Sequence, residues 1–175
     1  SKELHGTLVR IYGDDHGLYS LTYLAYEQMH QGQLDAARQS EARYLAVAEE
    51  LGNPLGLALT LLSAMTMRIA FRDVDGAAAL SARLVDVSLK HGFPWWREIA
   101  RCGDGWARAQ KGDHAGGIAE IERCIGFFHY IAQKRTLTYY LGLLVEALLL
   151  ASQYDKGIAV ADEALALAKE TRELL

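Results

Sequence analysis

Six histidines and two cysteines are the residues of this chain that are best suited to hold a metal ion. None of the histidines is spaced from another histidine, a cysteine or a carboxylate as in a recognised metal-binding motif. Cys102 and Cys124 lack the further ligands that a zinc site needs. We therefore expect no metal and no cofactor, and we expect two buried thiols in a reducing, cytoplasmic environment. The histidines are His5, His16, His30, His91, His114 and His129.

Acid/base or nucleophilic chemistry has little support in the sequence. The best candidate carboxylate pairs are Glu49 with Glu50 and Glu120 with Glu122. Residues one or two apart do not share a helix face, so neither pair can work together on one helix. The glycine-rich stretch 102–112 is neither a phosphate loop nor a dinucleotide fingerprint. We predict that this segment is not an enzyme. An enzyme of unknown reaction stays open as an alternative, and it would need Glu146 buried beside a histidine or a tyrosine in a cleft.

The elements that carry these residues are helices that repeat along the chain. The turn Gly32-Gln33-Leu34-Asp35-Ala36-Ala37 has three relatives, and their last residues Ala78, Gly117 and Gly157 follow at spacings of 41, 39 and 40. In this alignment Asp73 replaces the turn glycine. Apolar residues recur with helical periodicity and no segment alternates, so each unit of about 40 residues holds two helices and no strand.

Two further signals mark the borders of the units. Asn53 can cap a helix that begins at Pro54, and the same pattern recurs 40 residues later at Pro94. The small pair at residues 36–37 allows the two helices of a unit to approach closely. These signals predict an all-α, right-handed superhelical solenoid of about four helix pairs, because stacked pairs bury a core that no pair can bury alone. The units are 15–54, 55–94, 95–134 and 135–174, which together form a single domain over 15–174.

The two ends of the chain suggest that more protein adjoins them. Residues 1–14 carry apolar residues on one helical face, and we expect them to be the remnant of a preceding helix with a linker. The last helix is expected to bury a stripe over Ile158, Ala161, Leu165 and Ala168, and no polar capping helix follows it. Solenoids need polar caps. We therefore expect an internal piece of a longer protein, or a homodimer that forms through exposed solenoid ends.

The turn QGQLDAA and the stretch DGWARAQKGDHAGGI, residues 104–118, resemble tetratricopeptide repeats. The longer units, with YGDDHG, LGNP and HGFPWW at their borders, are similar to the helical-repeat region of large bacterial signalling proteins. Those proteins carry an ATPase module and are of the adenylate/guanylate cyclase type or the transcriptional-regulator type. The resemblance implies a non-catalytic interaction or regulatory module in a cytoplasmic protein, while ATPase or cyclase activity would lie elsewhere in the parent chain.

The same resemblance implies where a partner would bind, since the first helices of such repeats line a concave groove. The expected partner is a protein segment or a neighbouring domain of the same chain. Aromatic and methionine side chains suit a helix or an extended peptide. A sensor that holds a small molecule in the groove is the alternative. The expected groove residues are Tyr19, Tyr26, Met29, Met67, Trp106, Tyr139 and Glu146.

Charge and hydropathy exclude two classes of partner. The net charge is −4 and no run of lysine or arginine occurs, so the chain lacks the basic surface that nucleic-acid binding requires. The most apolar run, residues 137–151, is shorter than the roughly 20 residues of a membrane-spanning helix and contains Glu146. We expect no contact with nucleic acid or with a membrane.

Overall fold

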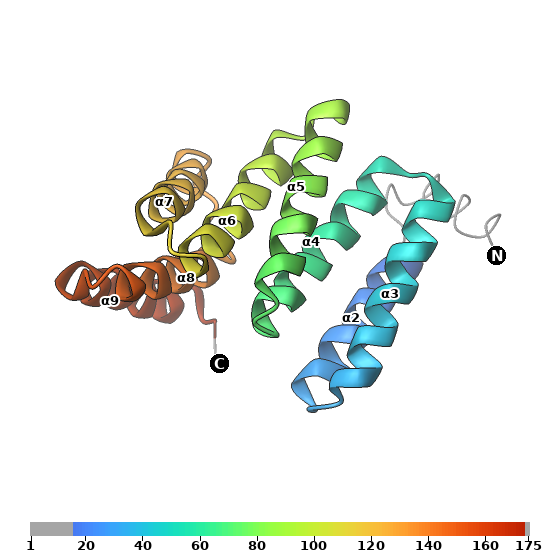
Figure 1. Ribbon diagram of the computed structural model, residues 1–175, viewed down its shortest axis with the longest axis horizontal. Helices are drawn as coiled ribbons and strands as arrows, with labels where there is room; N and C mark the ends of the chain where they lie inside the picture. The colour runs from blue at the N-terminus through green and yellow to red at the C-terminus, as the bar shows by residue number, and fades with distance from the viewer. Residues whose placement is uncertain (1–15, 174–175) are drawn as a thin grey trace.

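The computed structural model describes residues 16–173, which form eight α-helices and contain no β-strand (Figure 1). The all-α class is thereby confirmed for this part of the chain. The remnant helix expected over residues 1–14, with His5, lies outside the described residues. The helices are α2 (His16–His30), α3 (Leu34–Leu51), α4 (Pro54–Ala70), α5 (Val74–His91), α6 (Pro94–Gln110), α7 (His114–Tyr130), α8 (Leu137–Leu150) and α9 (Tyr154–Thr171).

Each of these helices is followed by a residue in the left-handed backbone conformation, and these residues recur every 20 positions. They are Gly32, Gly52, Arg72, Gly92, Gly112, Ala132, Ser152 and Arg172. The alignment that set Asp73 in place of the turn glycine is wrong by one residue. Arg72 takes that place with φ 59°, and Asp73 is the N-cap of the following helix. The geometry of the turn, and not the residue type, therefore keeps the register of the repeat.

The helix starts differ in how their free N–H groups are satisfied. The Asn53 side chain accepts hydrogen bonds from the backbone N–H of Leu55 (3.0 Å) and of Gly56 (3.3 Å), which confirms the predicted cap of α4. Asp73 and Asp113 cap α5 and α7 in the same manner. The N-cap residues of α3 and α9, Gln33 and Gln153, form no side-chain cap. In the two inner hairpins an aspartate therefore caps the start of the second helix, and in the two outer hairpins no side chain does so.

Small residues allow the two helices of a hairpin to approach. The buried residues Ala37, Ala77, Gly117 and Gly157 hold one position at intervals of 40. The backbones of α6 and α7 lie close together, since a Cβ at Gly117 would lie 2.5 Å from the carbonyl oxygen of Gly105. A Cβ at Gly157 in α9 would find its nearest neighbour at 3.8 Å. The third hairpin is therefore packed backbone to backbone, whereas the fourth leaves room for a methyl group.

The hairpins stack in chain order, from α2 and α3 at one end to α8 and α9 at the other (Figure 1). Each helix packs against the next one along the chain, and α2, α4, α6 and α8 also contact one another in succession. One continuous apolar core runs from Ala25 to Leu148 through these contacts. Adjacent hairpins thus supply each other's cover, as expected for stacked helical repeats.

Candidate functional site

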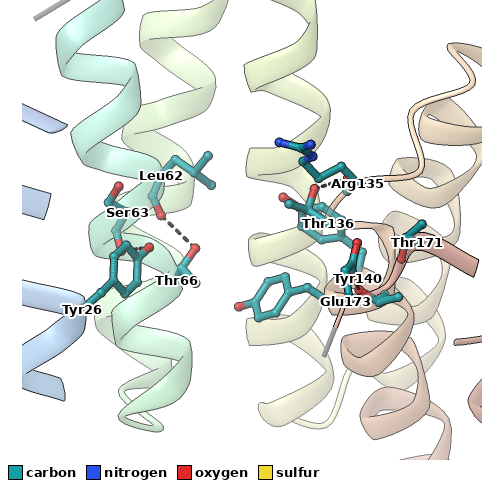
Figure 2. A pocket seen from close by; sticks show the side chains of 11 residues that line it. Tyr26, Leu62, Ser63, Thr66, Arg135, Thr136, Tyr140, Thr171 and Glu173 are labelled. Atoms are coloured by element: carbon teal, nitrogen blue, oxygen red, sulfur yellow. Dashed lines mark hydrogen bonds between the residues drawn. The ribbon is translucent and has the colours of Figure 1, made fainter. Parts of the chain in front are cut away.

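A groove of about 850 Å³ lies between the first two hairpins and the last one. Tyr26 of α2 and Leu62, Ser63 and Thr66 of α4 form one wall. The opposite wall comes from the loop before α8, the start of α8 and the end of α9 (Figure 2). The residues of this second wall are Arg135, Thr136, Thr138, Tyr139, Tyr140, Thr171 and Glu173. The groove therefore brings together segments that lie more than one hairpin apart in the sequence.

The tyrosines that line the groove are neutral hydrogen-bonding groups. The Tyr26 hydroxyl donates to the backbone oxygen of Ser63 at 3.2 Å. Burial raises the pKa of Tyr26 and, more strongly, the pKa of Tyr139, because the phenolate is disfavoured away from water. The Thr66 hydroxyl lies close to both phenols, and hydrogen bonding to it lowers the pKa of each and so offsets part of the effect of burial. These side chains offer aromatic faces and neutral hydroxyls to a ligand.

Stacked rings fix the second wall in place. Tyr140 stacks on Phe128 of α7 with a centroid distance of 5.0 Å, and Tyr139 meets Tyr140 edge to face at 5.3 Å. Such aromatic pairs add about 0.5–1.5 kcal/mol each beyond the area that they bury. The rings of the second wall are therefore held by the core before any ligand binds, and binding spends little entropy on ordering them.

A departure from the repeat pattern creates the rim of this wall. The helices α4 and α6 begin at Pro54 and Pro94, but the corresponding residue 40 positions later is Lys134. Here the chain stays non-helical until Leu137, with Thr136 in the left-handed conformation at φ 68°. The first turn of helix is replaced by a loop, and that loop supplies Arg135 and Thr136 to the groove.

Two charged groups complete the lining. Arg135 forms no ion pair with any residue from 16 to 173 and is exposed at the rim. Glu173 accepts a hydrogen bond from the Thr138 hydroxyl, and its other oxygen, Oε1, is buried without a hydrogen bond in the described structure. The groove can thus donate from a guanidinium to a carbonyl or carboxylate, and Glu173 adds a negative charge to its lining.

In a second polar cluster, centred on Glu146, the polar groups bond to one another. The Trp106 indole N–H donates to Glu146 at 3.2 Å and the Gln110 amide donates at 2.7 Å. Arg72 forms an ion pair with the same carboxylate, and its guanidinium lies 6.0 Å from the Trp106 ring centroid. This cluster joins α6 and α8 to the end of α4. Its carboxylate already has three donors, so it stabilises the stack and is poorly suited to bind a ligand.

The residues predicted to line the groove separate into three groups. Tyr26 and Tyr139 do line it. Met67 and Trp106 have no exposed surface, so their prediction as groove residues is corrected: they pack in the core. Tyr19, Met29 and Glu146 do not line this groove; Met29 packs against the core, and Glu146 belongs to the second cluster.

Several groove residues escaped the sequence analysis, chiefly Arg135, Thr136, Thr171 and Glu173. They lie in the loop before α8 and at the end of α9, while the prediction considered only the first helices of the pairs. The missing proline at Lys134 was a signal that this hairpin differs, but the sequence does not show which way the resulting loop faces.

Among residues 16–173, no three side chains of the metal-ligating types gather at one place. Cys102 and Cys124 are buried free thiols, as predicted, and burial raises the pKa of Cys102. Glu49 pairs with Arg83 and Glu122 with Lys156, at 2.5 and 2.6 Å, as exposed ion pairs between successive second helices. These carboxylates link hairpins at the surface.

None of the helices in the described part of the chain has both the length and the hydropathy for crossing a membrane. Comparison with protein-family models gives no match for this chain, and comparison with curated proteins gives no significant relative.

Proposed function

We propose that this chain is a non-catalytic interaction module, a right-handed tetratricopeptide-like solenoid whose groove binds an extended segment of a protein. The repeat of 40 residues, the left-handed turn at every twentieth position and the succession of first helices support this architecture. In such a stack the first helices face a common concave side, which is where a peptide finds a long continuous surface.

The groove is the observation that carries the proposal. It is a trough between separate hairpins, with phenols and hydroxyls on both walls. An extended peptide has alternating backbone donors and acceptors, and neutral hydroxyls can bond to either without a cost for burying charge. Arg135 and Glu173 place one charge of each sign in the lining. These features suit a peptide with apolar side chains and at least one basic group.

The resemblance of the turns to those of bacterial signalling proteins gives the proposal a setting. In that setting the bound segment belongs to a neighbouring domain of the same polypeptide or to another cytoplasmic protein. Its binding would change the activity of domains elsewhere in the parent chain, because it favours the conformation in which the segment occupies the groove.

A phage-displayed library of random peptides, selected on the 175-residue chain, tests the proposal. Selected peptides should bind the wild type, and Tyr26→Ala and Tyr139→Ala should each weaken the binding at least about tenfold, since aromatic contacts dominate peptide recognition. Tyr23→Ala is the matched control, because Tyr23 is an exposed tyrosine of α2 that does not line the groove. Peptides that bind all three variants as well as the wild type would refute the groove as the binding site.

A small-molecule sensor is the second candidate, and the size of the groove favours it. A volume of about 850 Å³ lies within the range of small-molecule sites, about 300–1,000 Å³. Thermal unfolding against a collection of metabolites separates the two, since a ligand that binds only the folded state raises Tm. A metabolite that raises Tm for wild type and not for Tyr139→Ala, with no peptide selected, would replace the peptide proposal by the sensor.

A further inference from the structure

The outer face of α9 is apolar and uncovered, although the same face of α7 is buried. Ile158 is 61% exposed and Leu165 is 58% exposed. Forty residues earlier, Ile118 and Ile125 of α7 are 6% and 7% exposed. The prediction that Ile158 and Leu165 belong to a buried stripe of the last hairpin is therefore wrong, because α9 packs on α8 through a different face that contains Gly157.

The corresponding helix shows what kind of element such a face accepts. α7 is packed between α6 and α8, whereas α9 contacts α8 and has no helix on its far side within residues 16–173. Tyr154, Ile158 and Leu165 follow one another at spacings of four and seven residues, so they form one stripe along the helix. A straight stripe of this kind fits another helix, laid along it.

Some charged residues of α9 form ion pairs with the rest of the protein, and others do not. Lys156 and Glu170 pair with Glu122 and Lys134 of the third hairpin and the loop that follows it, at 2.6 and 2.5 Å. Asp155 and Lys169 form no ion pair with any described residue, and helical geometry places them beside the two ends of the apolar stripe. They have opposite signs and lie about 21 Å apart along the helix, at a rise of 1.5 Å per residue.

We propose that two copies of this chain pair through their α9 helices, side by side and antiparallel. With the two-fold axis near residues 161 and 162, Ile158 of each copy meets Leu165 of the other. The same register brings Asp155 of each copy to Lys169 of the other, at both ends of the interface. A two-fold interface must be complementary to itself, and this stripe satisfies that condition in its apolar and its charged positions.

One residue acts against the pairing. Asp162 lies beside the stripe near the axis, so the two copies bring their Asp162 carboxylates towards each other. This repulsion and the short interface, one helix from each copy, are consistent with a dimer that exchanges with monomer. Ile158 lies outside the proposed peptide groove, whereas Leu165 borders an adjoining pocket of about 290 Å³ that shares Thr138, Tyr139 and Glu173 with it. The Ile158 variant therefore tests the dimer without altering the groove.

Sedimentation equilibrium of the full 175-residue chain over a range of concentrations tests the dimer. Wild type should shift from monomer to dimer with a Kd below about 1 mM. Ile158→Ser and Leu165→Ser should each raise that Kd at least about tenfold. Asp155→Lys and Lys169→Asp should each weaken the dimer, the double variant should restore it, and Asp162→Asn should strengthen it.

Tyr130→Ser is the control for loss of an exposed apolar side chain away from the stripe, since Tyr130 is exposed in α7 and should not affect the dimer. Circular dichroism verifies that every variant keeps its helix content, as expected for exposed positions. A wild type that stays monomeric to about 1 mM overturns the proposal. So does a dimer that persists in Ile158→Ser and Leu165→Ser, or a charge-swapped double variant that is no tighter than its single variants.

Discussion

The helices α7 and α9 hold the same place in consecutive hairpins, yet they have different surroundings. α7 is packed between α6 and α8, its N-cap is an aspartate, and it touches α6 backbone to backbone at Gly117. α9 packs mainly on α8 and touches α7 through exposed ion pairs, lacks a side-chain cap and leaves room at Gly157. Their sequences are similar in pattern, so the contrast teaches that burial in a stacked repeat depends on the neighbours of a helix more than on its own residues.

The largest difference between the two helices should come from removing an equivalent isoleucine. Ile118→Ala should lower the free energy of unfolding by about 2–4 kcal/mol, because it leaves a cavity in the core. Ile158→Ala should change it by less than about 0.5 kcal/mol, because the side chain is mostly exposed in the single chain. Urea unfolding at a protein concentration low enough to keep the chain monomeric measures both. Equal losses at the two positions would show that α9 is covered within one chain.

A methyl group added to the equivalent glycines should separate the hairpins next. Gly117→Ala should destabilise the fold by about 1–3 kcal/mol, because the new Cβ meets the carbonyl oxygen of Gly105 and α6 must move away. Gly157→Ala should be neutral or should stabilise by up to about 1 kcal/mol, since alanine favours helix over glycine and finds space. Thermal unfolding followed by circular dichroism gives the comparison, and a tolerated Gly117→Ala would disprove the close approach of α6 and α7.

The smallest effect concerns the caps. Asp73→Ala should lower the free energy of unfolding by about 1 kcal/mol, because the side chain accepts the Gly76 N–H at 3.0 Å and pairs with Arg68. Gln153→Asp should supply α9 with the cap that it lacks and should stabilise the chain by up to about 1 kcal/mol. Chemical unfolding of the two single variants measures the changes. No gain from Gln153→Asp would mean that the start of α9 cannot adopt the capped geometry.

The same cap predicts a response to pH. The hydrogen bond from Gly76 N–H, and then Arg68, lower the pKa of Asp73 below its ordinary value of 3.8. An acid whose folded-state pKa is lowered stabilises the fold above its unfolded pKa, and this contribution is lost as the pH falls through the folded value. Wild type should therefore lose more stability than Asp73→Asn when the pH is lowered from about 5 towards 3. Parallel acid curves would exclude the Asp73 carboxylate as the source.

Local features of the fold could be predicted because they depend on a few neighbouring residues. Asn53 followed by Pro54 predicts a capped helix start, and Gly32 predicts a left-handed turn; both are present. The sequence alignment placed the second of these turns one residue too late, at Asp73 instead of Arg72. Arg72 takes the left-handed conformation without being glycine, because the two packed helices on either side leave the connecting residue no other path.

The groove was predicted only in part, since two of its residues, Tyr26 and Tyr139, were expected there. Trp106 was expected as a partner contact because the resemblance placed it on the concave side of a first helix, but it is fully buried and bonds to Glu146. An aromatic residue on a helix looks the same in sequence whether its face is covered by another hairpin or open to a partner. Only the placement of the fourth hairpin opposite the first two distinguishes these cases.

The sequence by itself determined that this protein is helical, where its turns fall and which positions within a hairpin must be small. Helical periodicity, caps and left-handed turns depend on interactions between residues a few positions apart, so the local sequence is enough to predict them. The tertiary structure decided that Tyr26 faces Tyr139 across a groove and that Ile158 is exposed while Ile118 is buried. Those outcomes depend on how whole hairpins lie against one another, which is the sum of many weak contacts between residues far apart in the chain.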